Sequence, residues 1–435
     1  MENIIKQLYN VYKNHPSIST DSRKIIPGSI FFALKGDNFD GNQFAEEAIR
    51  KGAVLAVIDS PDYKKNEQYF LVDDSLKCLQ NLARHHRMNL TTTKIIALTG
   101  SNGKTTTKEL IKEVLGKKFK VVATDGNLNN HIGVPLTILS VTEDCDFAVI
   151  EMGANHLGEI SFLSEIIKPN FGIITNIGLA HVGKFGTKEN IIKAKNELYN
   201  FLEKNNGAVF VNITDLLLLN LSKNISRFTY GNSTEADCRV ELKNIFPSLE
   251  LIFKNKNIKT KIVGDFNFDN ISAAIAAGSF FDVEASAIKE AVENYVPQNN
   301  RSQIIQRNST SFFLDAYNAN PSSVHLVLNF FFRAPFVRKI VILGDMNELG
   351  EYSLNEHIKI LKEVSKSNIQ KAFIVGQNFI DAKKCGDIHE KNFSFFNDTN
   401  DLISFLKENK DILKNSFTLV KGSRKMGMER ILEFI

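Results

Sequence analysis

The stretch that decides the fold is KIIALTGSNGKTTTK, from Lys94 to Lys108. Its apolar first half predicts a buried strand, and apolar residues recur at helical spacing from Leu110 to Leu115. The loop between them, Gly100 to Gly103, lets backbone N–H groups converge on a phosphate at the start of a helix, where partial positive charge gathers. Leu98 stands where the general P-loop pattern has a glycine, so the loop is a shortened GxxGKT variant.

Three side chains around this loop predict a site for ATP and Mg²⁺. Lys104 is placed to reach the β- and γ-phosphates, and the hydroxyl of Thr105 is placed to bind the metal. Glu151 ends the apolar run Phe147–Gly153. A lone acid at a strand end is more often solvated, but Mg²⁺ prefers oxygen ligands, and a neighbouring strand of a P-loop sheet favours the metal.

The sequence as a whole predicts an α/β protein of three domains, because 435 residues at roughly 150 residues per domain correspond to about three. From Lys94 strands and helices alternate, which predicts a central parallel sheet with its ligand site at the carboxyl ends of the strands. A small α/β pattern precedes this unit, a stretch of short strands and turns lies at residues 206–264, and a Rossmann-like pattern follows. The predicted domains are residues 1–90, 91–300 and 301–435.

Composition excludes several other classes of protein. Lys and Arg number 53 against 49 Asp and Glu, a net charge of +4 spread along the chain, which is too small for a nucleic-acid-binding protein. The 4 cysteines lie far apart without a CxxC pair, so neither a disulfide scaffold nor a zinc module is indicated. The N-terminus lacks the pattern of a secretory signal and no run is long enough to insert in a membrane, so we expect a cytoplasmic protein.

Two further residues become candidates for a functional role only in combination with the phosphate loop. His181 follows the apolar run Phe171–Gly178, and Lys195 lies in a helical stretch. On its own, a histidine in a loop is most often a hydrogen-bonded structural residue, and a lysine on a helix is most often solvated.

Four motifs, taken in order, resemble the central domain of the Mur ligase family: TGSNGKTTTK from Thr99, EMGAN from Glu151, TNIGLAH from Thr175 and AKNEL from Ala194. This family builds peptidoglycan precursors, and so serves cell wall biogenesis, cell shape and cell division. It joins a carboxylate to an amine through an acyl phosphate, with ATP and Mg²⁺. The resemblance implies that two Mg²⁺ ions bind, the first at Thr105 and Glu151 and the second near His181. It also implies that CO₂ carbamylates Lys195 into a metal ligand, a step that needs a neutral lysine, which a semi-buried site can favour.

The resemblance extends to both ends of the chain. The motif TDSR, which contains Ser22 and Arg23, is similar to the UDP-binding domain of the family's later ligases, although Asn42 stands where histidine is common. Phe266 likewise replaces a histidine or tyrosine often seen before the first adenine-contacting asparagine. The nucleotide contacts that the resemblance implies are Gly100, Ser101, Asn102, Gly103, Lys104, Thr105, Thr106, Asn267, Asn270, Arg301 and Asp315.

One loop distinguishes between branches of the family. GNLNNHIGVP, from Gly126 to Pro135, resembles the loop of the ligases that add D-alanyl-D-alanine to UDP-N-acetylmuramoyl-tripeptide. The resemblance therefore implies substrate contacts at Asn129, Asn130 and His131. Three motifs near the C-terminus agree with this branch: DAYNANP at 315–321, LGDMNELG at 343–350 and VKGSR at 420–424.

Other interpretations stay open at this point. Third-residue muropeptide ligases and folate polyglutamate ligases share the central domain, and a non-catalytic nucleotide-binding regulator is a further alternative. The sequence does not distinguish a tripeptide ending in lysine from one ending in diaminopimelate. Because water would destroy an acyl phosphate, we expect the third domain to close over the site, with the Arg301 region as the hinge. We also expect the chain to work as a monomer.

Overall fold

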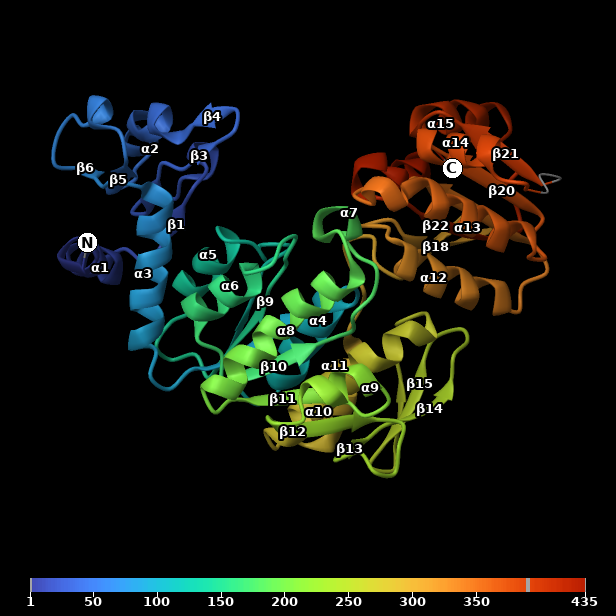
Figure 1. Cartoon of the computed structure of the whole chain (residues 1–435), viewed down its shortest axis with the longest axis horizontal. Coiled ribbons are helices and arrows are strands. Elements are labelled where there is room, and N and C mark those ends of the chain that lie inside the picture. The colour runs from blue at the N-terminus through green and yellow to red at the C-terminus, as the bar shows by residue number, and fades with distance from the viewer. Residues whose placement is uncertain (1, 389–391, 435) are drawn as a thin grey trace.

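The computed structural model describes residues 2–388 and 392–434, and three sheets with their helices dominate the architecture (Figure 1). The first lies in the N-terminal part, the second in the centre and the third in the C-terminal part. Two small antiparallel sheets accompany them. This confirms the predicted α/β class, with a central parallel sheet between two smaller α/β units. The exact bounds 1–90, 91–300 and 301–435 stay a prediction.

The N-terminal part is a four-stranded parallel sheet of order β1-β2-β5-β6. Its long helix α3 runs from this sheet to the central part (Figure 1). Buried polar contacts hold α3 there, because Nε2 of His86 lies 2.7 Å from the carbonyl oxygen of Val141 and Nε of Arg87 donates to that of Ile167 at 2.7 Å. The elements are α1 (Glu2–Asn14), β1 (Ile18–Ser19), β2 (Ile30–Phe32), β3 (Lys35–Gly36), β4 (Phe39–Asp40), α2 (Ala45–Arg50), β5 (Leu55–Ile58), β6 (Tyr69–Leu71) and α3 (Ser75–Asn89).

The central part is a seven-stranded parallel sheet of order β13-β12-β11-β10-β7-β9-β8. Alternate residues of β7 enter different hydrophobic clusters, Ile95 and Ala97 on one face and Ile96 and Leu98 on the other, as a strand covered on both faces requires. The elements are β7 (Lys94–Thr99), α4 (Lys104–Leu115), β8 (Val121–Ala123), α5 (Gly133–Leu139), β9 (Phe147–Glu151), α6 (Glu159–Ile167), β10 (Phe171–Ile174), α7 (Val182–Phe185), α8 (Lys188–Lys204), β11 (Ala208–Asn212), α9 (Leu216–Leu221), β12 (Ser226–Gly231) and β13 (Cys238–Arg239).

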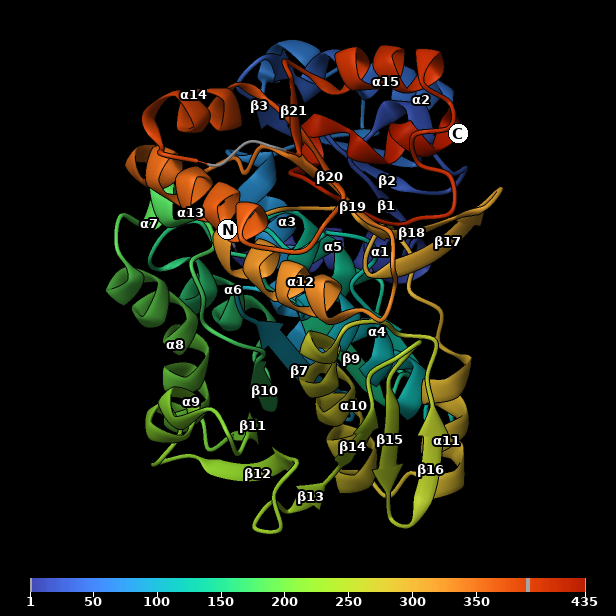
Figure 2. The ribbon, with the colours of Figure 1, turned by 90° about the vertical axis from the view of Figure 1, so that its right-hand side faces the viewer.

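The stretch predicted as short strands and turns contributes to two sheets. Strands β11 to β13 extend the parallel sheet, whereas β14 (Glu241–Asn244), β15 (Glu250–Phe253) and β16 (Lys256–Lys259) form an antiparallel sheet of their own, seen at the bottom of Figure 2. Helices α10 (Phe268–Phe280) and α11 (Ala285–Asn294) follow, and α10 packs against α4 through small side chains such as Ala274 and Ala277.

The C-terminal part is a six-stranded sheet of order β17-β18-β22-β19-β20-β21, in which only the edge strand β17 is antiparallel to its neighbour. Four of these strands match the predicted Rossmann-like pattern, and β17 and β21 are additions at its edges. The elements are β17 (Gln303–Arg307), β18 (Thr310–Asp315), α12 (Pro321–Arg333), β19 (Lys339–Gly344), α13 (Ser353–Ser365), β20 (Lys371–Val375), α14 (Gln377–Cys385), β21 (Phe393–Phe396), α15 (Thr399–Glu408) and β22 (Phe417–Lys421).

The sheet order of the central part locates the ligand site. The strand order reverses at β7, because β9 and β8 lie on one side of it and β10 to β13 lie on the other. Parallel sheets bind ligands beyond the carboxyl ends of strands at such a point. Among the residues that the structure describes, no helix is long and apolar enough to cross a bilayer.

Candidate active site

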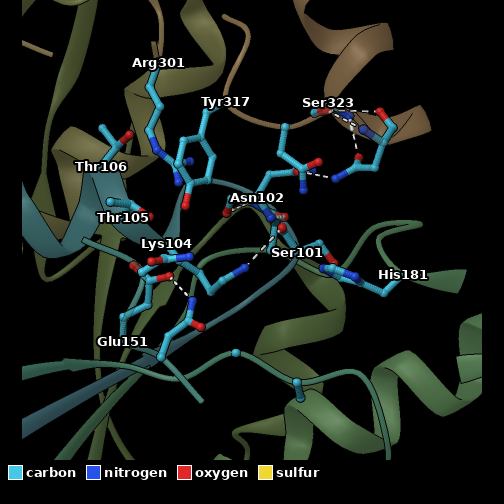
Figure 3. Close-up of a pocket in the computed structure, with 18 of the residues that line it drawn as sticks. Ser101, Asn102, Lys104, Thr105, Thr106, Glu151, His181, Arg301, Tyr317 and Ser323 are labelled. Carbon is cyan, nitrogen blue, oxygen red and sulfur yellow. Dashed lines mark hydrogen bonds between the residues drawn. The ribbon is translucent and has the colours of Figure 1, made fainter. Parts of the chain in front are cut away.

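A cavity of about 450 Å³ lies at the carboxyl ends of these strands, and the C-terminal part faces it from the other side. A cavity of this size holds a small molecule of nucleotide class. Figure 3 shows side chains from the phosphate loop, from Glu151, from His181 and from the C-terminal part that point into the same space. The predicted site residues that line it are Ser101, Asn102, Gly103, Lys104, Thr105, Thr106, Asn129, Asn130, His131, Glu151, His181, Lys195, Asn267, Asn270, Arg301 and Asp315.

The phosphate loop joins β7 to α4 in a conformation that requires its two glycines. Gly100 and Gly103 have φ values of 146° and 80°, and a Cβ atom on Gly103 would lie 2.3 Å from Oδ1 of Asn270. Nζ of Lys104 bends back over the loop and donates to the carbonyl oxygen of Gly100 at 2.7 Å. Burial lowers the pKa of Lys104 and Arg301 lowers it further, although the nearby Glu151 opposes both. A polyphosphate would add negative charge beside these two cations and so favour the charged form of Lys104.

Glu151 ends β9 beside this loop and presents one oxygen without a partner. Its side chain is buried, and Nδ2 of Asn129 donates to Oε1 at 2.7 Å. Oε2 has no hydrogen-bond partner among residues 2–388 and 392–434. A buried carboxylate oxygen in this state is costly unless a cation or a donor meets it. Thr105 lines the same cavity, and both side chains offer the oxygen ligands that Mg²⁺ prefers.

The rest of the donor set also fits magnesium. Within the described residues, no three His, Cys, Asp or Glu side chains cluster as a ready metal site. Mg²⁺ is usually held by one or two carboxylates together with substrate phosphates and water, so it does not need such a cluster. The residues present therefore suit a metal that arrives with a nucleotide.

Lys195 lies on α8 with only 3% of its surface exposed. In the part of the chain that the structure describes, its ammonium group makes no hydrogen bond or ion pair, and the ring of Phe185 lies 5.7 Å from Nζ. Burial lowers the pKa of Lys195 to about 7, and the charge of Lys104 adds to the effect. A large fraction of this side chain is therefore a neutral amine at neutral pH.

His181 starts the short helix α7 with a left-handed backbone, φ 54°. Burial lowers the pKa of its imidazole, against the pull of Glu348 and with the help of Lys104 and Lys195. Nδ1 of His181 lies 2.5 Å from Oε2 of Glu348, which comes from the C-terminal part, although the contact is not aligned as a hydrogen bond. The sequence alone contains no signal for this pairing.

The predicted adenine contacts, Asn267 and Asn270, lie in one wall of the cavity. Their side chains bond to each other, with Nδ2 of Asn270 donating to Oδ1 of Asn267 at 2.9 Å, and Thr107 donates to Oδ1 of Asn270 at 3.0 Å. These bonds connect α10 to α4 directly behind the phosphate loop. Asn267 also donates from Nδ2 to Oγ of Ser302 at 3.2 Å.

Arg301 and Asp315 occupy the C-terminal side of the cavity. The guanidinium group of Arg301 stacks 3.6 Å from the ring centre of Tyr317 (Figure 3). Oδ2 of Asp315 pairs with Nζ of Lys421 at 2.5 Å, and Lys421 is buried. Tyr317 and Lys421 both line the cavity, and sequence reasoning placed neither among the site residues. Tyr317 lies two residues beyond the end of β18 and Lys421 ends β22, and these positions at strand ends were the signal available in the sequence.

Three predicted residues lie outside the cavity lining. Gly100 shapes the phosphate loop without facing the space itself. Ser22 and Arg23 lie in the N-terminal part, where the carbonyl oxygen of Ser22 accepts from Lys51 at 3.0 Å and Arg23 forms a two-bonded pair with Asp21. The structure therefore does not bring these two residues to the phosphate loop. Asn42, nearby, is buried and bridges Asp40 and Asp59.

Comparison with known proteins decides the family. Three Mur ligase models match in the same order as the three sheets: "Mur ligase family, catalytic domain" at residues 16–87, "Mur ligase middle domain" at 98–278 and "Mur ligase, glutamate ligase domain" at 300–424. A Bacillus subtilis protein named UDP-N-acetylmuramoyl-tripeptide–D-alanyl-D-alanine ligase is 35% identical over 96% of this chain and 92% of its own length. The chain belongs to the Mur ligase family.

Solved Mur ligases share the whole architecture. MurF from Acinetobacter baumannii superposes with a TM-score of 0.86 at 28% identity, covering 99% of this chain and 97% of its own. MurF from Thermotoga maritima, solved with ADP, gives 0.82 at 25% identity, covering 100% and 98%. The resemblance predicted from four motifs is therefore confirmed, and so is the choice of branch within the family. A Mur ligase with ADP bound also agrees with the predicted use of ATP.

Proposed function

We propose that this chain is an ATP-dependent ligase that joins D-alanyl-D-alanine to UDP-N-acetylmuramoyl-tripeptide through an acyl phosphate. One observation carries the proposal: a phosphate loop, Glu151 and the buried Lys195 face one cavity, and within residues 2–388 and 392–434 neither Oε2 of Glu151 nor the ammonium group of Lys195 has a hydrogen-bond partner. The names of the relatives at 30% identity and above describe this reaction.

The first chemical step is phosphoryl transfer. An oxygen of the tripeptide carboxylate attacks the γ-phosphorus of ATP, the bond to the β-γ bridging oxygen breaks, and ADP leaves. Negative charge on the transferring group is stabilised by Lys104, by the N–H groups at the start of α4 and by Arg301. Lys104 must give up its bond to the carbonyl oxygen of Gly100 to reach the phosphates.

The second step is acyl transfer. The free amine of D-alanyl-D-alanine attacks the acyl carbon, and the tetrahedral species expels inorganic phosphate as the carbon–oxygen bond breaks and the nitrogen loses a proton. Water competes with the amine, so the cavity has to exclude it. We propose that the C-terminal domain, residues 301–435 with the Arg301 region as hinge, closes for this purpose.

Thr105 and Glu151 would hold Mg²⁺, which neutralises phosphate charge when bound, with a second ion near His181. Lys195 would carry a carbamate: its neutral nitrogen bonds to the carbon of CO₂ and releases a proton, which turns a buried amine into a carboxylate-like oxygen donor. The support is the depressed pKa of Lys195 and its lack of a partner in the described part of the chain.

The remaining roles are also proposals. The loop that contains Asn129, Asn130 and His131 would contact the muropeptide, and Ser22 and Arg23 would contact its UDP group. Asn267 and Asn270 would lie beside adenine, while Asp315 would face ribose or phosphate. The monomeric state, the cytoplasmic location and domain limits at 90 and 300 stay predictions from the sequence.

The deciding experiment measures phosphate release from ATP with UDP-muramoyl-tripeptide, with and without D-alanyl-D-alanine. Release that needs both substrates, with a pentapeptide product by mass, is the expected result. Release driven by a third-residue amino acid and the dipeptide precursor would replace the proposed substrates with those of another branch.

A separate experiment tests the carbamate. Lys195→Ala should be inactive and should regain part of its activity with added formate or acetate, which can supply the missing carboxylate. Full activity without any added carboxylate would remove the carbamate from the mechanism.

A further inference from the structure

The loop that carries His181 is also a docking surface for the C-terminal part. Helix α7 packs on the turn Gly350–Tyr352, where the N–H of Gly183 donates to the carbonyl oxygen of Glu348 at 3.1 Å and the hydroxyl of Tyr352 donates to that of Gly186 at 3.0 Å. A Cβ atom on Gly183 would lie 2.6 Å from the backbone nitrogen of Gly350. The two backbones therefore touch, although they are far apart in sequence.

At the edge of this interface the side chain of Glu348, which is 41% exposed, contacts His181 and Lys184. Its Oε2 lies 2.5 Å from Nδ1 of His181 and its Oε1 lies 3.4 Å from Nζ of Lys184. Glu348 has a left-handed backbone, φ 67°, a conformation that is unfavourable for a residue with a side chain. Its carbonyl oxygen accepts from Gly183, and its carboxylate lies between His181 and Lys184.

We infer that Glu348 is a positioning residue for His181: the C-terminal domain supplies the carboxylate that orients this imidazole toward the cavity. The inference rests on the proposed role of His181 near a metal ion. It adds that this role needs Glu348 and therefore depends on the docking of the C-terminal domain. With Nδ1 against Glu348, Nε2 is the ring nitrogen left for the cavity that His181 lines. Histidines that bind metals commonly turn their other ring nitrogen to a carboxylate in this way, which fixes both the tautomer and the ring orientation.

This arrangement makes the site depend on domain docking. Thr105, Glu151 and Lys195 all belong to the central domain, so their positions do not require the C-terminal domain. His181 is different, because the carboxylate beside it arrives from another domain. The His181 side of the site is complete only when α7 and the Gly350 turn are in contact.

The matched variants separate positioning from simple attachment of the domain. Glu348→Ala removes the carboxylate, whereas Glu348→Gln removes the charge but keeps a carbonyl oxygen beside Nδ1. Tyr352→Phe removes the bond from Tyr352 to Gly186 in the same interface without touching His181. Lys184→Ala removes the other partner of Glu348.

The readout is the affinity for Mn²⁺ in the presence of ADP, measured without turnover by the electron paramagnetic resonance of free Mn²⁺. We expect Glu348→Ala to bind Mn²⁺ roughly tenfold more weakly and Glu348→Gln to recover the greater part of this loss. Tyr352→Phe and Lys184→Ala should stay within about twofold of the wild type. Equal losses in Glu348→Ala and Tyr352→Phe, or no loss in either, would overturn the inference.

The tautomer of His181 gives a second, independent measurement. In ¹⁵N-histidine-labelled protein, with the signal assigned by its absence in His181→Gln, wild type should show hydrogen on Nδ1 and Glu348→Ala a mixture of both tautomers. An unchanged tautomer in Glu348→Ala would contradict the positioning role. If the wild type released no phosphate with both substrates, the proposed function would fail, but the tautomer comparison would still decide this inference.

Discussion

Nδ2 of Asn129 donates to Oε1 of Glu151 at 2.7 Å, which ties the loop predicted to contact the muropeptide to the carboxylate predicted to hold Mg²⁺. The backbone of Asn129 strengthens the tie, because its carbonyl oxygen accepts from Gly153 at 2.8 Å. With Oε1 occupied, Oε2 is the oxygen free to meet a metal. A change in the substrate loop is therefore expected to change metal binding as well.

Asn129→Ala tests this link. Loss of the bond frees the Glu151 carboxylate to rotate, so we expect the Mg²⁺ concentration needed for half-maximal activity to rise roughly tenfold. Asp125→Asn is the control, since its exposed side chain lies just before the same loop, does not line the cavity and makes no hydrogen bond within the described residues. A magnesium titration of both variants is the measurement, and matching curves would refute the link.

Lys104→Ala tests the phosphate loop. Removing the cation proposed to face the β- and γ-phosphates should lower ATP turnover by about 10²–10³-fold while the protein stays folded. Lys112→Ala, an exposed lysine on the same helix, should retain normal turnover. Steady-state phosphate release together with circular dichroism distinguishes lost chemistry from lost structure. Turnover retained in Lys104→Ala would exclude the P-loop role.

Lys195→Met should stabilise the protein in a pH-dependent way. The pKa of Lys195 is about 7 in the folded protein and near 10.5 when unfolded, so the unfolded chain binds more protons between these values. Stability of the wild type therefore rises with pH across this window, and below pH 7 the cost of the buried charge is present in full. We expect the free energy of unfolding of Lys195→Met to exceed that of the wild type by at least about 1 kcal/mol at pH 6.5. This difference should shrink toward pH 10.

Urea unfolding of both proteins in buffer free of CO₂ and divalent metal measures this difference. Lys193→Met, two residues away on an exposed position of the same helix, controls for the loss of a charge. A gain that does not change with pH would show that burial leaves the pKa of Lys195 near its ordinary value.

His131→Ala should separate the two substrates. The side chain of His131 lines the cavity, while its carbonyl oxygen accepts from Nε2 of Gln80 at 3.0 Å and keeps the loop in place. Loss of one substrate contact of about 1–1.5 kcal/mol should raise the KM for UDP-muramoyl-tripeptide roughly tenfold. The Kd for ADP, measured by calorimetry, should not change. A weakened ADP affinity with a normal KM would place His131 at the nucleotide instead.

Much of the fold and the site could be predicted because its determinants are local. The phosphate loop is a strand, a glycine turn and a helix in 15 residues from Lys94 to Lys108, and the periodicity of these residues is visible without the rest of the chain. Glu151 was predictable for a related reason, since parallel neighbouring strands end at the same edge of the sheet.

What the sequence did not reveal depends on contacts between distant segments. Tyr317 and Lys421 reach the cavity, and Glu348 reaches His181, only because the C-terminal part faces the phosphate loop. No periodic pattern in the sequence indicates that contact. The buried state of Lys195 is similar, because a lysine on an amphipathic helix is ordinarily solvated and only the packing of α8 covers it. Strands such as β17 and β21 lie at sheet edges, where weak apolar patterning suffices.

Gly183→Ala should prevent the C-terminal domain from docking. The added Cβ atom would lie 2.6 Å from the backbone nitrogen of Gly350 and 2.8 Å from the carbonyl oxygen of Glu348, so a rigid backbone must move away. Displacing Arg301, Asp315 and Lys421 from the phosphate loop by about 1 Å is enough to lower the ligation rate by about 10²-fold. Lys184→Ala is the control on the same helix, because it removes only an exposed ion pair, which contributes little. Small-angle scattering with ADP and Mg²⁺ should give a larger radius of gyration for Gly183→Ala than for Lys184→Ala. Identical scattering profiles with identical rates would mean that the contact between α7 and the Gly350 turn does not hold the domains together.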